Sequence, residues 1–360
     1  MNRKLIALAV AGACVAPVAM AQTANPVTLY GKVYATFESI EATGGTAAQN
    51  DGTKRRNRVE DQASRLGVRG TEDLGGGLKA IFQLETAFRP DSNNTTFAAR
   101  NSGVGLQGAA WGTIMMGRWD TPFKVVTGAI DPFGDVTIGG FKTTMNDHGN
   151  FDRRDQNVVQ YWSPNWGGLA VRLMYQANEA KTATADPKDY GASLTYTAGP
   201  LYLALAYEQH KDQVASANVT TSATAAGKKE TGIALGGTFA FGAFKIGGLY
   251  EKIDKSDREE VKAWMANAIW TLGNNQFIYQ YGQAEGGFLN GATQMDCNSN
   301  VFGWQYNFSK RTFVLAQYAQ IKNDTSVSVC GIGTAVAFSG SALSGGQDPK
   351  GLSLGISHVF

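Results

Sequence analysis

The sequence predicts an all-β chain that closes into a 16-stranded antiparallel transmembrane β-barrel. Three observations lead to this fold class. Segments along the whole chain alternate apolar with polar or small side chains, the period-two pattern of strands that have one apolar face. Short connections between these segments alternate with long polar ones. Beyond residue 21 there is no run of 18 apolar residues, which excludes a helical membrane protein.

The first 21 residues are expected to be a signal peptide, which leaves 22–360 for the barrel. Two positive residues, Arg3 and Lys4, precede an apolar run and an A-x-A cleavage site that ends at Ala21. The competing interpretations are a membrane anchor and a lipoprotein signal that ends at Cys14. The apolar run is short for a spanning helix, and the residues before Cys14 lack the larger apolar residue with which a lipoprotein cleavage box begins.

The net charge of the expected mature chain is zero. Cleavage removes Arg3 and Lys4, so the 32 Lys and Arg residues become 30, which equals the 30 Asp and Glu residues. This balance gives no indication of a nucleic-acid surface. Any selectivity for charge must therefore come from where individual charges lie.

The connections set the number of strands. Seven are short: Asp73–Gly77, Ala109–Gly112, Asn165–Gly168, Ala198–Pro200, Phe241–Ala243, Gly273–Asn275 and Ser309–Arg311. Long polar stretches lie between them, roughly at 38–63, 89–99, 120–153, 179–188, 211–229, 253–260, 285–299 and 323–350. The seven turns join fourteen strands, and strands at Val27–Phe37 and Gly351–Phe360 make sixteen. Short turns at one rim and long loops at the other are typical of a membrane barrel, which must close because every strand needs a partner.

The predicted hairpin at 64–85 indicates which face meets water. Leu66 and Val68 share one face of its first strand, whereas Arg65 and Arg69 share the other. In the second strand, Glu85 lies on the charged face. Charges facing lipid would cost several kcal/mol, about 2–4 at the bilayer midplane, but charges facing a lumen stay solvated. Sixteen strands leave a lumen too wide for side chains to fill, so the interior is expected to be an aqueous channel.

Aromatic residues gather beside the short turns, as expected for a ring at one membrane interface. They are Trp111, Trp162, Trp166, Tyr196, Tyr202, Phe239, Phe244, Trp270, Phe277, Phe308 and Phe313. Ordinary β-propensity would instead scatter aromatic residues along the strands.

Five stretches resemble the general diffusion porins of Gram-negative outer membranes. They are "VTLYGKVYATFE" at 27–38, "SRLGVRGTEDLGGGLKAIFQLE" at 64–85, "GTIMMGRWDTP" at 112–122, "NVVQYWSPNWGGL" at 157–169 and the terminal "GISHVF". The resemblance covers essentially all of 22–360. It implies a homotrimer in the outer membrane with an inward-folded third long loop that narrows the pore. It also implies lipid, lipopolysaccharide and, during biogenesis, the barrel-assembly machinery as partners.

The longest connection, 120–153, suits the inward loop and contains "DPFGD" at 131–135, which resembles the acidic tip of the family's loop. The resemblance assigns Asp131, Asp135 and the wall residue Glu85 to the acidic side of the pore constriction. It assigns a basic wall to Lys32, Arg65, Arg100, Arg118 and Arg154. Arg100 falls on the same side of its predicted strand as the apolar Val104 and Leu106, so a regular strand would point it at lipid. It needs either a bulge or a position above the membrane. Opposed charges at a narrow waist would create a transverse field.

Two cysteines, Cys297 and Cys330, remain after signal cleavage. Both fall in expected long loops on either side of one hairpin, so they can approach each other at the same rim. In an exported protein they form either a disulfide or two free thiols.

The last predicted strand, Gly351–Phe360, is expected to pair with Val27–Phe37 and so remove both edges of the sheet. In the family such a terminal aromatic residue is read by the assembly machinery, which makes Phe360 the expected assembly signal.

Other functions have weaker support in the sequence. An outer-membrane enzyme needs a nucleophile with a His partner or paired acids. His210 and His358 have no suitable Ser beside them, and His148, near Asp147 and Asp152, lacks a second His for a metal site. We therefore expect no catalytic residue, no metal and no cofactor. A substrate-specific channel or an adhesin-type barrel is the alternative function.

Overall fold

The computed structural model describes residues 26–44, 54–92, 95–134, 137–144, 151–177, 181–212, 227–255, 260–286, 296–324, 330–332 and 346–360. The expected signal peptide at 1–21, the loop residue Asp135 and the candidate ligand His148 lie outside these residues.

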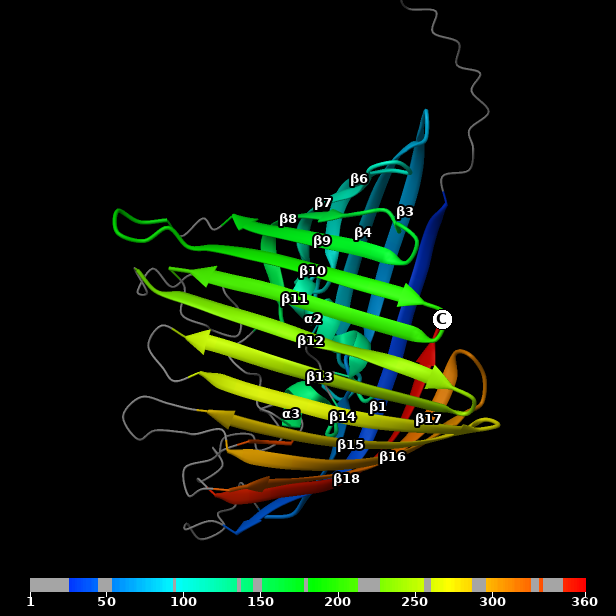
Figure 1. Cartoon of the computed structure of the whole chain (residues 1–360). Helices are drawn as coiled ribbons and strands as arrows, with labels where there is room; N and C mark the ends of the chain where they lie inside the picture. The colour runs from blue at the N-terminus through cyan, green and yellow to red at the C-terminus, as the bar shows by residue number, and fades with distance from the viewer. Residues whose placement is uncertain are drawn as a thin grey trace, which may run out of the picture.

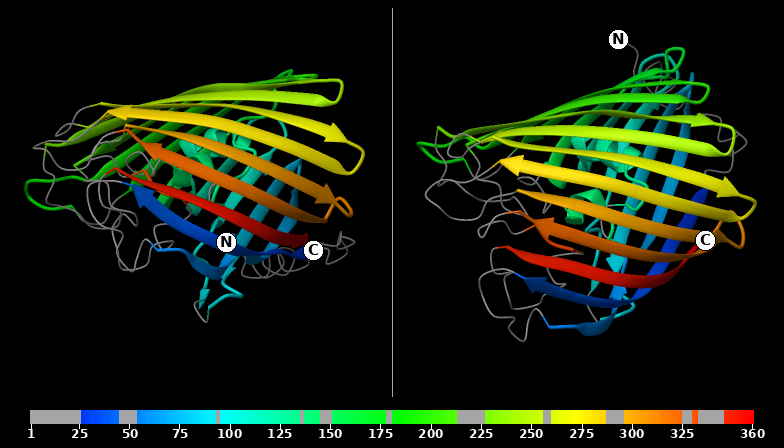
Figure 2. Two further views of the ribbon diagram at one scale, coloured as in Figure 1. Left: turned by 90° about the horizontal axis from the view of Figure 1, so that it is seen from below. Right: turned by 60° about the horizontal axis from the view of Figure 1, so that its bottom comes forward.

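Sixteen antiparallel strands close into one barrel, as predicted (Figures 1 and 2). The strand segments are β1 (Val27–Gly44), β2 (Arg56–Asp61), β3 (Arg65–Gly75), β4 (Leu78–Phe88), β5 (Thr95–Thr96), β6 (Ser102–Gly108), β7 (Gly112–Asp120), β8 (Arg154–Trp162), β9 (Leu169–Ala177), β10 (Lys188–Ala198), β11 (Leu201–Lys211), β12 (Lys229–Phe241), β13 (Phe244–Lys255), β14 (Val261–Leu272), β15 (Asn275–Gly286), β16 (Cys297–Asn307), β17 (Thr312–Asn323) and β18 (Gln347–Val359). Both β2 and β3 pair with β1 and are two parts of one barrel strand. The two-residue β5 pairs with the end of β4, and β6 pairs with the rest of β4.

The break between β2 and β3 is a local bulge opposite Tyr34. Ala63 there has a positive φ of 57°, and the Ser64 amide donates to the Asp61 carboxylate. The Gln62 amide donates to the Tyr34 carbonyl at 2.8 Å, while the Ser64 hydroxyl accepts from the Tyr34 amide at 2.9 Å. The bulge therefore interrupts the ladder without leaving the Tyr34 backbone unpaired.

All seven short connections lie between paired neighbouring strands, as predicted. The tight turn after β3 contains Gly76 and Gly77 with φ of 61° and 80°, a region in which side-chain-bearing residues are strained. The predicted short connection at Asp73–Gly77 is confirmed as a turn.

Several long connections are shorter than predicted because strands continue into them. β1 extends to Gly44, β2 begins at Arg56 and β13 extends to Lys255, so much of 38–63 and part of 253–260 is strand. Within β2, Arg58 forms ion pairs with Glu38 at 2.7 Å and Glu60 at 3.0 Å. Beyond the membrane the outer face of a strand no longer has to be apolar, so the alternating pattern that revealed the strands disappears there.

The two faces of the wall differ as the alternation predicts. On β11, Leu203 and Leu205 are 47% and 43% exposed, whereas Ala204 and Ala206 between them are 3% and 0% exposed. On β1, Phe37 is exposed and Glu38 is buried. The outer surface is therefore apolar, and the buried side chains point inward. No helix among the described residues is both long and apolar enough to cross a membrane.

Aromatic rings form a continuous row across the short-turn ends of β12 to β15. Ring centroids are 5.8 Å apart for Phe241 and Phe244, 6.3 Å for Phe244 and Trp270, and 5.4 Å for Trp270 and Phe277. These rings are exposed on the outside of the barrel. Their position at one rim fits a membrane-interface girdle.

The connection between β7 and β8 contains two helices, α2 (Pro122–Ile130) and α3 (Phe141–Thr144), which lie within the barrel outline (Figure 1). Thr121 caps α2, because its hydroxyl accepts a hydrogen bond from the Lys124 amide, and Pro122 occupies the first turn. The buried side chains of α2 include Phe123, Val126 and Ile130. They pack against the small residues that the inner faces of β11 and β12 present.

Cys297 and Cys330 form a disulfide with a Cα–Cα distance of 6.3 Å. Cys297 is the first residue of β16 and not part of a loop, which corrects its predicted position. Cys330 and Ile332 are buried against Ile40 and Ile321. The bond therefore joins the segment at 330–332 to the wall of the barrel.

The disulfide predicts a cross-linked peptide pair in the exported protein. Non-reducing mass spectrometry of a protease digest should recover Cys297 and Cys330 in one linked fragment, which separates into two after reduction. Recovery of both residues as free thiols in the unreduced digest would contradict the bond.

The barrel closes between its first and last strands, β1 and β18, with Tyr34 opposite Ser357 in the register. Gly31 and Phe360 exchange backbone hydrogen bonds, each of 3.1 Å, and the Phe360 ring fills the space that a Cβ of Gly31 would need. The C-terminus lies at the rim of the short turns (Figure 2).

Deletion of Phe360 should sharply lower the yield of folded barrel, because it removes both terminal hydrogen bonds and the ring that covers Gly31. Secretion should be unaffected, so unfolded monomer should accumulate. Heat-modifiable migration on gels distinguishes the two forms. A truncated chain that folds at the normal yield would mean that Phe360 has no closing role.

Candidate functional site

The connection between β7 and β8, called here the inner segment (residues 121–153), is attached to the wall by side-chain amides. Asn267 of β14 donates to the Ile130 carbonyl at 3.1 Å, and Gln280 of β15 donates to the Gly139 carbonyl at 3.1 Å. Gln317 of β17 donates to the Thr137 hydroxyl at 3.3 Å. These three strands therefore hold the middle of the inner segment.

Glycines allow the inner segment to approach the wall closely. A Cβ on Gly303 of β16 would lie 2.5 Å from the Phe133 ring, and one on Gly139 would lie 2.5 Å from Val301. Such distances are too short for real carbon atoms, so both positions require glycine for this contact.

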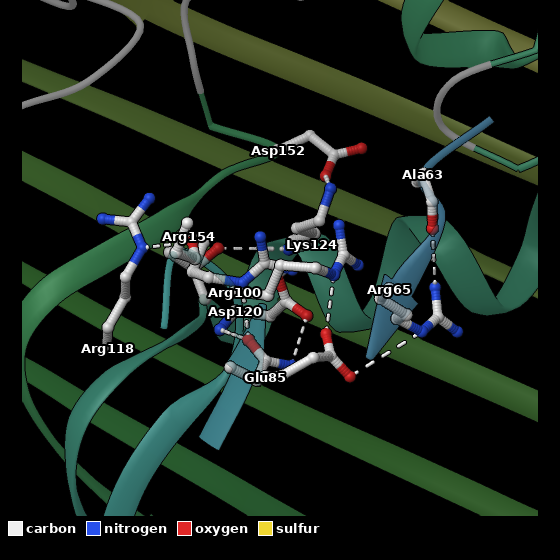
Figure 3. Close-up of polar contacts among 12 residues, drawn as sticks. Ala63, Arg65, Glu85, Arg100, Arg118, Asp120, Lys124, Asp152 and Arg154 are labelled. Atoms are coloured by element: carbon white, nitrogen blue, oxygen red, sulfur yellow. Dashed lines mark hydrogen bonds and ion pairs between the residues drawn. The ribbon is translucent and has the colours of Figure 1, made fainter. Parts of the chain in front are cut away.

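A group of charged side chains centres on Glu85 of β4 (Figure 3). Arg100 donates to one carboxylate oxygen at 2.6 Å, and Arg65 lies 3.7 Å from the other. The Tyr30 hydroxyl also donates to Glu85 at 3.1 Å. One carboxylate therefore positions two guanidinium groups that come from distant parts of the chain.

Lys32 and Arg65 are direct partners in the register between β1 and β3. Both lie on the inner face, opposite the exposed side chains Leu66 and Phe37. The Lys32 ammonium lies 4.8 Å from the centre of the Tyr34 ring, a distance suited to a cation–π contact. The structure thus brings together two of the predicted basic residues.

A second charged pair lies where β7 and β8 meet the inner segment. Arg154 is 2.7 Å from the Asp120 carboxylate and donates to the Asn101 side-chain carbonyl at 2.6 Å. Asn101 in turn donates to Asp120 at 2.8 Å. These contacts with Asn101 and Asp120 hold Arg154 in place. Arg154 and Asp120 lie close to Arg100 (Figure 3).

The inner segment contributes a positive charge of its own. Lys124 of α2 lies 3.0 Å from the Asp152 carboxylate, which also accepts from the Thr127 hydroxyl at 3.2 Å. The sequence pattern did not single out Lys124, because only its place in a helix folded against the wall brings it near the basic residues.

Arg100 faces Glu85 through an irregular backbone, the first of the two expected alternatives. Ala98 has a positive φ of 52°, and the Arg100 amide donates to the Glu85 carbonyl at 3.0 Å. The chain enters the regular ladder of β6 only at Ser102.

Three predicted site residues have contacts that bear on the expected constriction. Glu85 lies among the basic side chains and pairs with Arg65 and Arg100. The Asp131 carboxylate accepts from the backbone amides of Phe133 and Phe141 at 3.0 and 2.7 Å, which makes it a brace within the inner segment. The third of these residues is Arg118.

Arg118 is turned away from the other basic residues (Figure 3). In the regular alternation of β7, Arg118 falls with the exposed Ile114 and Met116. Trp119 falls with the buried Thr113 and Met115, and its ring lies 5.2 Å from that of Trp162. Arg118 donates to the Ala99 carbonyl at 2.8 Å and lines a separate recess together with Arg89 and Phe97. The regular alternation of β7 therefore turns Arg118 away from the basic wall to which the resemblance assigned it.

The sequence prediction also missed a buried ionic cluster beneath the inner segment. It consists of Arg153, Asp155, Asp189, Glu208, His210 and Glu230. Part of the cluster could have been predicted, because the regular alternation of β10, β11 and β12 points their polar residues inward. Within the described residues, no group of three or more His, Cys, Asp and Glu side chains is arranged to hold a metal ion.

Comparison with known proteins identifies the family. The family model described as "Gram-negative porin" matches residues 7–326. Outer membrane porin protein 32 of Delftia acidovorans is 32% identical over 376 aligned positions that cover 100% of both chains. An outer membrane porin protein of Bordetella pertussis is 28% identical over 84% of this chain and 90% of its own.

Solved structures agree with this relationship. The anion-selective porin from Comamonas acidovorans has a TM-score of 0.75 and 27% identity, and the match covers 93% of this chain and 100% of that one. OmpF of Salmonella typhi shares the fold at a TM-score of 0.67 and 18% identity, covering 93% of this chain and 98% of its own. The chain described here therefore belongs to the Gram-negative porins and is a channel-forming barrel of the outer membrane.

Proposed function

We propose that the water-filled channel of this porin is narrowest between a basic cluster and the inner segment, and that anions pass it more readily than cations. The basic cluster is defined as Lys32, Arg65, Arg100 and Arg154. Ions and small hydrophilic solutes would diffuse through this waist without a binding step.

The local charge balance carries this proposal. The basic cluster and Lys124 supply five positive charges, whereas their ion-pair partners Glu85, Asp120 and Asp152 supply three negative ones. An excess of two positive charges in a confined aqueous space raises the local concentration of anions. The relative from Comamonas acidovorans, which is titled an anion-selective porin, supports the same sign.

The expected transverse field is weaker than the resemblance implied. Asp131 is held by backbone amides of the inner segment, and that segment also carries Lys124. Net positive charge at the waist, more than opposition of charges across it, is therefore the proposed basis of selectivity.

For assembly, we propose a homotrimer in contact with lipid and lipopolysaccharide, inserted by the barrel-assembly machinery. One structural relative, OmpT of Vibrio cholerae, is described in a trimer form. The apolar outer face offers a surface for both lipid and neighbouring subunits. We propose no catalytic activity for the barrel.

Liposome swelling with a series of sugars of increasing size tests the general diffusion function. A smooth fall in swelling rate with sugar size is expected for an unselective water-filled waist. Saturation with a single sugar would instead support a substrate-specific channel. Absence of swelling by reconstituted, folded protein would support the adhesin alternative.

A further inference from the structure

The end of the inner segment enters a buried ionic cluster in the barrel wall. Arg153 lies 2.7 Å from Asp155 of β8, contacts Asp189 of β10 directly and lies 3.8 Å from Glu208 of β11. The side chains of these four residues are at most 8% exposed. A guanidinium so deeply buried is stable only because carboxylates surround it.

His210 extends the cluster toward β12. One ring nitrogen lies 2.9 Å from Glu208, and the other lies 3.7 Å from Glu230. The Phe151 ring stacks on the imidazole with centroids 4.2 Å apart and planes inclined by 12°. The inner segment thus covers His210 with Phe151 and reaches the carboxylates with Arg153.

The same residues tie both ends of the inner segment together. The Thr121 amide donates to the Arg153 carbonyl at 3.1 Å, and the Thr121 hydroxyl donates to the Phe151 carbonyl at 3.3 Å. Thr121 is the cap of α2, so displacement of Arg153 would also disturb the start of that helix.

Glycine makes room for this contact on the wall. A Cβ added to Gly232 of β12 would lie between 2.6 and 3.0 Å from three atoms of the Phe151 ring. On the neighbouring strand β13, a Cβ added to Gly248 would have only one neighbour within 4 Å, at 3.5 Å, which is an ordinary contact. These two glycines therefore form a matched pair for mutation.

The charge balance of the cluster depends on protons. Four carboxylates, those of Asp155, Asp189, Glu208 and Glu230, share one guanidinium and one imidazole. Further charged groups lie around the cluster: Lys124 of α2, Lys142 of α3, Asp152 of the inner segment, Glu251 of β13 and Arg118 of β7. Protonation of carboxylates next to Arg153 removes the attraction that offsets the burial of its charge.

We propose that the ionic cluster is a proton-sensitive latch, in which Arg153 is the positioning residue that fixes the inner segment against β8, β10 and β11. This inference rests on the proposed function, since it concerns the segment that sets the waist. The latch is intact while Asp155 and Asp189 are ionised. Acidification into the range where carboxylates take up protons, about pH 4, releases the segment, and the channel then fluctuates between conductance levels.

Single-channel recording in planar bilayers tests the latch. For the wild type, the frequency of transitions between conductance levels should rise by about tenfold or more between neutral pH and about pH 4. D189N should show the same increase already at neutral pH, because it lacks one of the charges that hold Arg153, and should respond less to acid. The control E41Q removes a carboxylate that pairs at 2.7 Å with the exposed Arg55, and it should behave as the wild type does.

Gly232→Ala tests the same latch without changing any charge. It should raise the transition frequency at neutral pH by displacing Phe151, whereas Gly248→Ala should not. If D189N does not assemble, the comparison of the two glycine variants still decides the outcome. Equal transition frequencies for Gly232→Ala and Gly248→Ala, or a wild-type frequency that does not change with pH, would overturn the latch.

Failure of the latch and failure of the proposed function give different results. If no variant and no wild-type sample conducts, the channel function is wrong. If all of them conduct with the same reversal potential and the same gating at both pH values, the channel stands and the latch does not.

Discussion

Replacement of residues 127–145 by a short Gly-Ser linker should raise single-channel conductance by about twofold or more, because the lumen of a sixteen-stranded barrel is a wide aqueous channel unless a segment enters it. The replaced stretch contains Ile130 and Phe133, which pack against the wall, and the acceptors of the wall amides Asn267 and Gln280. Its removal leaves every strand pairing of the barrel intact. Planar-bilayer conductance of folded, heat-modifiable protein is the measurement.

A linker of the same kind in place of 213–226, between β11 and β12, is the control for this replacement. It shortens the chain by a comparable amount without touching the inner segment, so its conductance should stay near that of the wild type. An unchanged conductance after replacement of 127–145, in a barrel that assembles normally, would show that the inner segment does not limit the flow of ions.

Charge reversal in the basic cluster should invert the selectivity of the channel. Arg65→Glu changes the local charge by two, which brings the excess of two positive charges to zero. The double variant R65E/R100E should carry an excess of two negative charges and favour cations. The reversal potential in a salt gradient should therefore shift in steps and change sign with the double variant.

Arg55→Glu is the matched control for this series, since it makes the same change in charge at an arginine that is 67% exposed. Salt screens such a charge over about 10 Å at moderate ionic strength, so its effect on the reversal potential should be small. Equal shifts for Arg55→Glu and Arg65→Glu would mean that total charge, and not the waist, determines selectivity.

The strands and turns could be predicted because lipid imposes one apolar face on every spanning segment. The prediction failed where that constraint ends: β1 continues to Gly44 and β2 begins at Arg56, in a stretch that the sequence suggested was loop. Polar residues on both faces of such an extension look the same in sequence as an irregular connection.

Residues of the candidate site could be placed from the sequence where their strand keeps the regular alternation of inward and outward side chains. Arg65 and Lys32 lie on regular strands and were placed correctly on the inner face. Arg118 was not, because it shares the outward positions of Ile114 and Met116 on β7, and its assignment rested on a motif instead of on the alternation. Glu208 and His210 could be recognised as inward polar residues, but nothing in their own strand reveals that Phe151 and Arg153 cover them.

The most direct measurement of how this porin works is the reversal potential of the wild-type channel in a gradient of potassium chloride, whose two ions have nearly equal mobilities. The excess of positive charge at the waist predicts a potential with the sign of chloride selectivity, and a smaller magnitude at higher salt because screening weakens the local field. A potential with the sign of potassium selectivity would contradict the assignment of the basic cluster and the inner segment as the waist.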